Sequence, residues 1–245
     1  MKLPTLRRLW LVATIGALAA CAPPSTQDTV PSTSMTAAAT TVTAKSSEWP
    51  PSGPVEPGTY HIASSAWSVS GFTVTMPAGW EIHPAIPLGA IKHSDQNGEL
   101  AFYFVIVDAI YSDPCVGPEG GADELMEVGP SVDHLANALL EQPHTVATGP
   151  VDTTLGGLPA KRIDLTMADD PETASCNIDL PGNLQIWYSA PADKYFVLLG
   201  DGTASVYILD VNGERQVFLT HYRAAARAED IAEMQTIIES IKIDT

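Results

Sequence analysis

The chain has few basic residues. Among its 245 residues, 12 Lys and Arg stand against 29 Asp and Glu, which gives a formal net charge of −17. Three of the basic residues, Lys2, Arg7 and Arg8, fall in the first eight positions, so the rest of the chain is more acidic still. Such a surface repels phosphate backbones and anionic lipid headgroups. The composition therefore predicts no nucleic acid partner, and any attachment to a membrane requires something other than a basic face.

The chain also lacks the sequence motifs of well-known catalytic sites. It contains no Gly-x-Ser-x-Gly, His-Glu-x-x-His or Ser-x-x-Lys motif, and no P-loop, Rossmann glycine pattern or EF-hand loop. We therefore predict that the protein is not an enzyme and holds no cofactor.

The six histidines are not spaced as metal ligands usually are, so we expect these side chains to face solvent. The least improbable metal trio is His83 and His93 with Asp95. The acidic segment 169–172 could bind calcium through carboxylate oxygens, but a solvated loop is the favoured interpretation. The sequence thus predicts no metal site.

Long hydrophobic runs are absent as well, except for a short one near the start. The basic residues named above precede the apolar run Leu9–Leu18, which is too short to span a bilayer. It ends in Leu18-Ala19-Ala20-Cys21, which resembles the lipobox of bacterial lipoproteins, in which the cysteine thiol receives a diacylglycerol and the peptide is cut just before it. We predict a signal peptide over residues 1–20 and an extracytoplasmic protein, lipid-anchored through Cys21 to the outer face of the cytoplasmic membrane. The alternative is an ordinary secretory signal with a chance cysteine, and the export route, Sec or twin-arginine, stays open.

The next segment is poor in large apolar side chains. Residues 22–57 hold thirteen Ser or Thr, seven Pro and four charged residues, and the first large aromatic side chain is Trp49. Such a composition cannot bury enough surface to fold. We predict that the lipidated cysteine and the segment behind it, residues 21–57, form a disordered tether with an r.m.s. span of roughly 30–35 Å. Residues 58–245 then form a single domain of ordinary size.

Cysteine is rare, with three in the whole chain. If Cys21 is acylated, Cys115 and Cys176 remain as an even pair, and in an oxidising compartment such a pair most economically forms a disulfide. A metal pair or a thiol nucleophile is the alternative, although neither cysteine lies in a Cys-x-x-Cys or nucleophile motif.

The pattern of apolar residues predicts an α+β domain. Runs with strand character are Gly71–Met76, Leu100–Ile110, Thr145–Leu155, Pro159–Met167, Leu184–Tyr188 and Tyr195–Leu199. A helix capped by Ser131 is expected to bury Val132, Leu135, Ala136 and Leu139. A final helix is expected to bury Ile231, Met234, Ile238 and Ile241. Tight turns between successive strands favour antiparallel neighbours, so we predict a single antiparallel β-sheet flanked by helices.

Asn212-Gly213 carries the strongest local signal. Both residues tolerate positive φ, which fits a two-residue type I′ turn between two strands. The resulting register pairs Val211 with Glu214 and Asp210 with Arg215. We expect the second pair to be an exposed ion pair rather than part of an active site.

Several short motifs together resemble a known family. The lipobox and the Thr/Pro-rich tether are followed by Gly71-Phe-Thr-Val-Thr-Met-Pro-Ala-Gly-Trp80, by Leu155-Gly-Gly-Leu-Pro-Ala160 and by Ile237-Ile-Glu-Ser-Ile-Lys242. This combination is similar to actinobacterial cell-envelope lipoproteins of the LpqN type. The resemblance implies a PsbP-like α/β/α sandwich that acts mainly as a non-catalytic adaptor or accessory module, and it carries over no catalytic residue.

Candidate binding residues fall in two groups. Trp67, Trp80 and Trp187 could line an apolar pocket, although tryptophan at strand ends is more often packing. Asp123 and Glu124 lie in the acidic, glycine-rich segment 117–129, where an irregular loop could form a binding surface.

Three hypotheses for the function are compatible with the sequence. An adaptor that docks another envelope protein comes first and requires an exposed apolar or acidic patch. A carrier of a lipid or small envelope molecule comes second and requires an apolar pocket of several hundred Å³. A cell-wall hydrolase, with converging carboxylates or a Ser/His/Asp set, comes last.

Overall fold

Antiparallel strands dominate the fold. The computed structural model describes residues 47–82, 89–94, 98–115, 125–178 and 180–245. The largest sheet has eight strands, and every neighbouring pair in it is antiparallel. In spatial order these strands are β10 (Thr145–Leu155), β11 (Leu158–Met167), β16 (Gly202–Val211), β17 (Glu214–Arg223), β7 (Gly98–Val105), β6 (Gly89–Ser94), β5 (Trp80–Ile82) and β2 (Gly53–Val55).

Three smaller sheets accompany the large one. One contains β1 (Ser47–Glu48), β3 (Gly58–Ile62), β4 (Phe72–Met76) and β18 (Lys242–Ile243), and β1 pairs with β3 in parallel. Another contains β15 (Lys194–Leu198), β14 (Leu184–Ser189), β8 (Ala109–Tyr111) and β9 (Leu125–Glu127). The third is the pair β12 (Asn177–Ile178) and β13 (Leu180–Pro181).

The prediction of an α+β fold with antiparallel strands is confirmed, but that of a single sheet is wrong. The run Leu100–Ile110 reads as one strand in the sequence, whereas the structure divides it. Its first part, β7, pairs with β17 of the large sheet, and its last part, β8, pairs with β14 of another sheet. An unbroken apolar run does not reveal such a change of sheet, because both ends are equally buried.

Three helices are present in the described residues: α1 (Val132–Glu141), α2 (Pro171–Ala174) and α3 (Ala228–Ser240). The Ser131 hydroxyl caps α1 by accepting a hydrogen bond from the His134 amide at 3.1 Å, and Leu135, Ala136 and Leu139 are buried as expected. The final helix buries Met234 and Ile238 as expected, together with Ile237.

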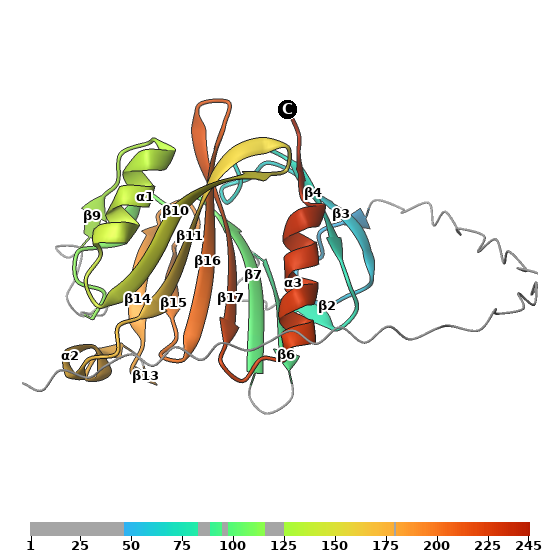
Figure 1. The fold of residues 1–245 in the computed structure, drawn as a ribbon. Helices are drawn as coiled ribbons and strands as arrows, with labels where there is room; N and C mark the ends of the chain where they lie inside the picture. The colour runs from blue at the N-terminus through green and yellow to red at the C-terminus, as the bar shows by residue number, and fades with distance from the viewer. Residues whose placement is uncertain (1–46, 83–88, 95–97, 116–124, 179) are drawn as a thin grey trace, which may run out of the picture. The chain divides into compact units, whose positions relative to one another are not determined.

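The large sheet has a hydrophobic core on each face. Alternate residues of β16 point to opposite faces: Tyr207 belongs to the first cluster and Ile208 to the second. The first cluster lies under α3 and the sheet containing β4, and the second lies under α1 and the sheet containing β14. Figure 1 shows α1 and α3 on opposite sides of the large sheet's strands.

The folded part extends into the segment expected to be a tether. Trp49 packs edge-on against Tyr60 and Phe104, with ring centroids 5.9 and 6.0 Å apart, and Val55 is buried. These side chains anchor β1 and β2, so residues 47–57 belong to the folded domain although their composition is rich in proline. The predicted signal peptide and Cys21 lie outside the described residues. No helix in the described part of the chain is long and apolar enough to cross a membrane.

The hairpin β16–β17 has the expected register. Val211 pairs with Glu214 and Asp210 with Arg215, and the turn residues Asn212 and Gly213 have φ values of 57° and 91°. The prediction of an exposed Asp210–Arg215 ion pair is wrong, however. Asp210 accepts a hydrogen bond from the Gly213 amide, while Arg215 is buried.

Arg215 instead binds backbone carbonyls. Its guanidinium donates hydrogen bonds to the carbonyl oxygens of Val107, Gly129 and Ser131. Val107 lies just before β8, and the other two lie between β9 and α1. The arginine therefore ties β17 to the layer that covers the second cluster.

Candidate functional site

A pocket of about 380 Å³ lies between the large sheet and the sheet β15-β14-β8-β9, and we call it the inter-sheet pocket. Its lining residues come from β7 and β17 on one side and from β14, β15 and the two residues flanking β15 on the other. It therefore opens within the second cluster, where the two layers meet at the edge strand β15.

Aromatic rings form one wall of this pocket. Trp187 stacks on Phe196 with ring centroids 4.7 Å apart, and Phe196 meets the His221 ring edge-on at 5.9 Å. A bulge between Gln185 and Trp187 shifts the register so that Trp187 lies directly opposite Phe196. Directly opposed residues of antiparallel strands share a face, so the bulge brings both rings to the pocket.

The other wall follows from the register of β7 and β17. Tyr103 lies opposite Leu219, and His221 lies opposite Ala101. Alternation along each strand then places Glu99, Tyr103 and Val105 on the same face as Leu219 and His221. The result is an apolar wall with two polar side chains, Tyr103 and His221, and a carboxylate at the end of β7.

His221 is uncharged inside this wall. The side chain is 3% exposed, and burial lowers its pKa from 6.5 to about 4. The Asp201 carboxylate raises this pKa by a smaller amount, and the Arg223 guanidinium lowers it slightly. Its Nε2 atom has no hydrogen-bond partner among the described residues. The ring lies against Gly202, where any Cβ would collide with it, so the glycine makes room for the imidazole.

Tyr103 is also uncharged at neutral pH. Burial and the nearby Glu99 carboxylate raise the pKa of its phenol well above the ordinary value of 10. Charged lining residues are Glu99, Asp193 and Lys194, and the last two are exposed. The Asp193 carboxylate accepts a hydrogen bond from the Tyr188 hydroxyl at 2.9 Å. The pocket thus has a neutral, mainly apolar interior and a charged rim.

Of the three tryptophans proposed for binding, the structure brings Trp187 to this pocket. Trp80 is buried in the first cluster, where its indole nitrogen donates a hydrogen bond to Glu233 at 2.9 Å. Trp67 is half-buried and packs against both clusters. Asp123 and Glu124 lie outside the described residues.

The disulfide between Cys115 and Cys176 is confirmed, and their Cα atoms are 4.9 Å apart. It joins the segment after β8 to the segment after α2, and it indicates an oxidising, extracytoplasmic compartment. Both alternatives for this pair, a metal pair and a free thiol nucleophile, are excluded in the bridged state.

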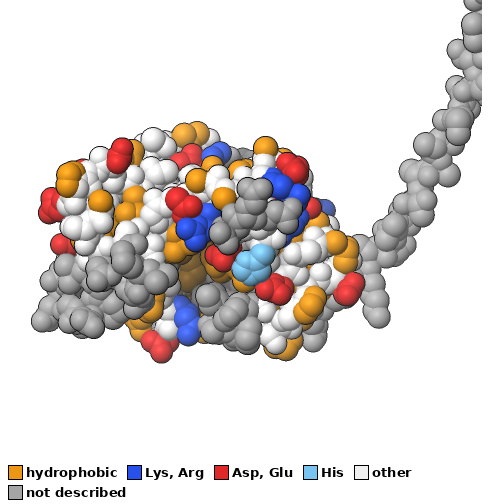
Figure 2. All heavy atoms as spheres, turned by 90° about the horizontal axis from the view of Figure 1, so that it is seen from below, with side chains coloured by type: hydrophobic (Ala, Val, Ile, Leu, Met, Phe, Trp, Pro, Cys, Tyr) orange, Lys and Arg blue, Asp and Glu red, His pale blue; other side chains and the backbone are white. Residues whose placement is uncertain are grey.

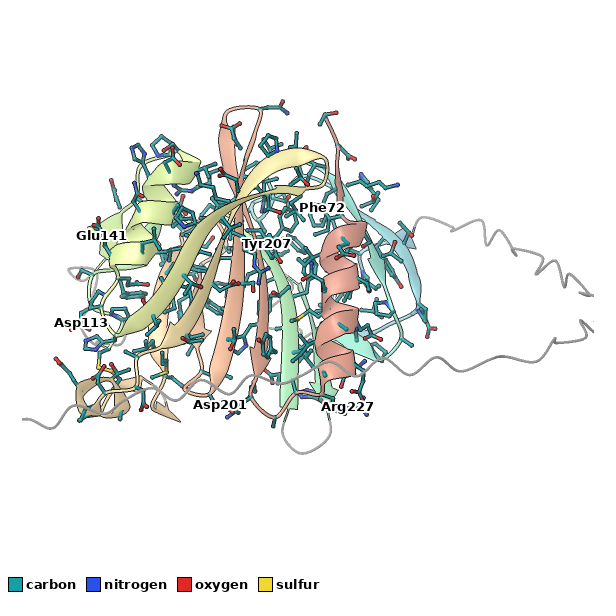
Figure 3. All side chains as sticks on the ribbon, in the orientation of Figure 1. Phe72, Asp113, Glu141, Asp201, Tyr207 and Arg227 are labelled. Atoms are coloured by element: carbon teal, nitrogen blue, oxygen red, sulfur yellow. A yellow bond between two sulfur atoms is a disulfide. The ribbon has the colours of Figure 1, made fainter. Side chains whose placement is uncertain are left out.

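Two polar side chains accompany the disulfide. His144 Nε2 lies 3.5 Å from an Asp113 carboxylate oxygen, which also accepts a hydrogen bond from the Cys115 amide at 2.9 Å. Figure 3 shows Asp113 beside α2. Asp113, Cys115 and His144 are close enough to share a metal ion, but the Cys115 sulfur is held in the disulfide and offers no thiolate.

The residues considered for metal binding have other neighbours. His83 and Asp95 lie outside the described residues, and His93 approaches Glu81 and Glu99 at 3.5 and 3.9 Å. In the segment 169–172, Asp170 caps α2 through hydrogen bonds from the Thr173 amide and hydroxyl.

No family model matches this sequence, and no curated protein matches it. Among solved structures, it is similar to LpqN, which is involved in cell envelope biogenesis of Mycobacterium tuberculosis, with 13% identity and a TM-score of 0.34 over 79% of this chain and 91% of LpqN. It is also similar to cyanobacterial PsbP (CyanoP) from Synechocystis sp. PCC 6803, with 9% identity and a TM-score of 0.36 over 78% of this chain and 96% of that one. Membership of the LpqN-type family stays a prediction.

Proposed function

We propose that this protein is an exported, non-catalytic binding protein of the cell envelope that holds a small apolar molecule in the inter-sheet pocket. The observation that carries the proposal is the pocket itself. Its volume of about 380 Å³ falls in the range of small-molecule sites, and its wall is built from Trp187, Phe196 and Leu219. The same lining contains the uncharged phenol of Tyr103, which can orient a ligand by hydrogen bonding.

This proposal places the carrier ahead of the adaptor. The large apolar side chains that are exposed in the described residues are Met126, Val146, Val151 and Tyr195, and they belong to three different strands. On the face shown in Figure 2, acidic, basic and apolar side chains are interspersed rather than gathered by kind. Docking to an envelope protein therefore has less support than ligand binding, and it stays a prediction.

A binding role also fits the chemistry of the pocket better than hydrolysis does. Its lining contains no Ser, Thr or Cys that could act as a nucleophile. His221, the one imidazole in the wall, has no carboxylate hydrogen-bonded to it among the described residues that could orient it as a base.

The test is native mass spectrometry of the chain with Cys21→Ser, made in an exporting actinobacterial host so that no covalent lipid complicates the mass. We expect a reproducible excess mass that is lost on extraction with organic solvent. The variant Leu219→Trp, which fills the pocket, should lack this mass, whereas Ala226→Trp, next to the first cluster, should keep it. A bare mass for the unfilled protein, together with no change in tryptophan fluorescence on adding neutral apolar compounds, would refute the proposal.

We also propose that the protein is attached to the outer face of the cytoplasmic membrane through Cys21. The apolar run and lipobox-like motif support the anchor, and the disulfide supports the compartment. Two acyl chains give lasting attachment, whereas a single one does not. We expect Cys21→Ser to abolish incorporation of labelled fatty acid and to leave residues 1–20 uncleaved, because cleavage follows acylation of the cysteine. A Cys21→Ser variant that still incorporates the label would contradict the lipid anchor.

A further inference from the structure

The interior of the inter-sheet pocket offers hydrogen bonds but no positive charge. Its polar lining groups away from the rim are the His221 imidazole and the Tyr103 phenol, and both are neutral at pH 7 for the reasons given above. A buried carboxylate without a cationic partner loses its hydration at a cost of several kcal/mol. An anionic head group in the interior is therefore strongly disfavoured.

The charges at the rim of the pocket also disfavour an anionic ligand. Two carboxylates, Glu99 and Asp193, stand there against one ammonium, that of Lys194. Lys194 is exposed, so its charge is screened by water and salt. A ligand whose anionic head stays at the mouth would meet more negative than positive charge.

The walls and the volume of the pocket determine the polarity and the size of the ligand. Trp187, Phe196 and Leu219 provide apolar surface on both sides. At about 30 Å³ for a small non-hydrogen group, a volume of 380 Å³ accommodates roughly a dozen such atoms. The Tyr103 phenol is the polar group of this wall that a ligand can pair with, because the unpaired Nε2 atom of His221 is itself buried and lies against Gly202. A hydroxyl group both donates and accepts, so it can pair with this phenol in either direction.

We infer that the inter-sheet pocket selects an uncharged, mainly apolar molecule of about a dozen non-hydrogen atoms that bears a hydroxyl group, and that it rejects the carboxylate of the same length. This inference rests on the proposed function, because it names the ligand class of the same pocket. The hydroxyl group lies against Tyr103, and the chain lies along the aromatic wall.

The test compares 1-decanol with decanoate at pH 7.5, using the full chain with Cys21→Ser after removal of any co-purified ligand. Binding is followed by tryptophan fluorescence and by calorimetry. We expect decanol to bind at least tenfold more tightly than decanoate. Equal or tighter binding of decanoate would overturn the inference and leave the proposed function standing. Failure of both compounds to bind would count against the proposed function itself.

Two matched variants test the hydrogen-bonding part. Tyr103→Phe removes the hydroxyl in the pocket, and we expect it to weaken decanol binding about fivefold to tenfold, as the loss of one hydrogen bond does. Tyr207→Phe makes the same change on the opposite face of the large sheet and should leave the affinity unchanged. Wild-type affinity in Tyr103→Phe, with thermal unfolding showing that the variant is folded, would overturn the assignment of the hydroxyl group to this wall.

Discussion

At the scale of single residues, the burial of His221 depends on strand register and not on composition. The sequence alone favoured solvent-facing histidines, and for this one the prediction is wrong. The Asn212-Gly213 turn fixes the register of β17, and two-residue alternation then places His221 on the same face as Val217 and Leu219, which is a core face. The hairpin register thus predicts which face of β17 carries His221. It does not predict that His221 is buried, because the sequence does not show that another layer covers this face.

His221 should make stability depend on pH. Its pKa in the folded state, about 4, lies below the ordinary 6.5, so between these values the unfolded chain binds more protons than the folded one. The free energy of unfolding therefore falls as the pH is lowered from 6.5 to 4, by about 3 kcal/mol at most. Urea unfolding at pH 7, 5.5 and 4 measures this slope. His221→Phe should remove it, and an unchanged slope in that variant would contradict the prediction.

Arg215 should be worth more to stability than its exposed counterpart Arg223. Arg215→Met leaves three backbone carbonyls without their donor, and we expect a loss of about 3 kcal/mol in the free energy of unfolding. Arg223→Met breaks a 2.9 Å pair with Asp201 in which both side chains are 40% exposed, and it should cost less than about 1 kcal/mol. Denaturant unfolding of the two variants gives the comparison, and equal losses would show that Arg215 is not a structural clamp.

At the scale of elements, sequence patterns within one segment predicted the helices, strands and hairpin of that segment. The capped helix α1, the strands β4, β10 and β11 and the hairpin β16–β17 follow from side-chain periodicity and turn residues that lie within a few positions of one another. The break between β7 and β8, and the bulge that aligns Trp187 with Phe196, depend on partners that are distant in sequence. The inter-sheet pocket depends on both, so the sequence pointed to Trp187 without showing which residues would face it.

The N-terminal turn of α3 contains a buried ion cluster that periodicity did not suggest. Asp230 is 2% exposed and contacts Arg227 at 2.7 Å, Lys92 at 2.9 Å and Ser94 at 3.0 Å. Hydrogen bonds from Arg227, and then from Lys92 and Ser94, hold the pKa of Asp230 well below its usual range against the opposing effect of burial. Figure 3 shows Arg227 at the end of α3. The cluster fixes this helix to β6.

Removing the central carboxylate should loosen α3. Asp230→Ala leaves Lys92 without one of its two carboxylate partners, and we expect a loss of about 3 kcal/mol. Glu229→Ala changes an exposed carboxylate in the same turn and should cost less than about 1 kcal/mol. Because the pKa of Asp230 is depressed, its contribution is present above about pH 4 and is lost as the pH falls further. Urea unfolding at pH 7 and pH 3 checks both points, and equal losses in the two variants would contradict the cluster's role.

At the scale of the whole molecule, the disulfide links two segments that are far apart in sequence. Cys115 and Cys176 are separated by 61 residues, and closing a loop of this size removes about 4 kcal/mol of chain entropy from the unfolded state. We expect Cys115→Ser with Cys176→Ser to lower the free energy of unfolding by up to this amount. Denaturant unfolding of the oxidised protein and the double variant measures the difference. A double variant as stable as the oxidised protein would mean that the bridge has no stabilising role.

The position of β18 has a consequence for the order of synthesis. Its residues pair with β4, and α3 packs over the first cluster with Phe72 and Phe102, so the last elements made complete a core begun by the first. The early strands therefore lack part of the cover for their apolar face until α3 has been made. A chain cut short before α3 would leave that part of the core exposed, so we expect added protease to cleave it faster than the intact chain.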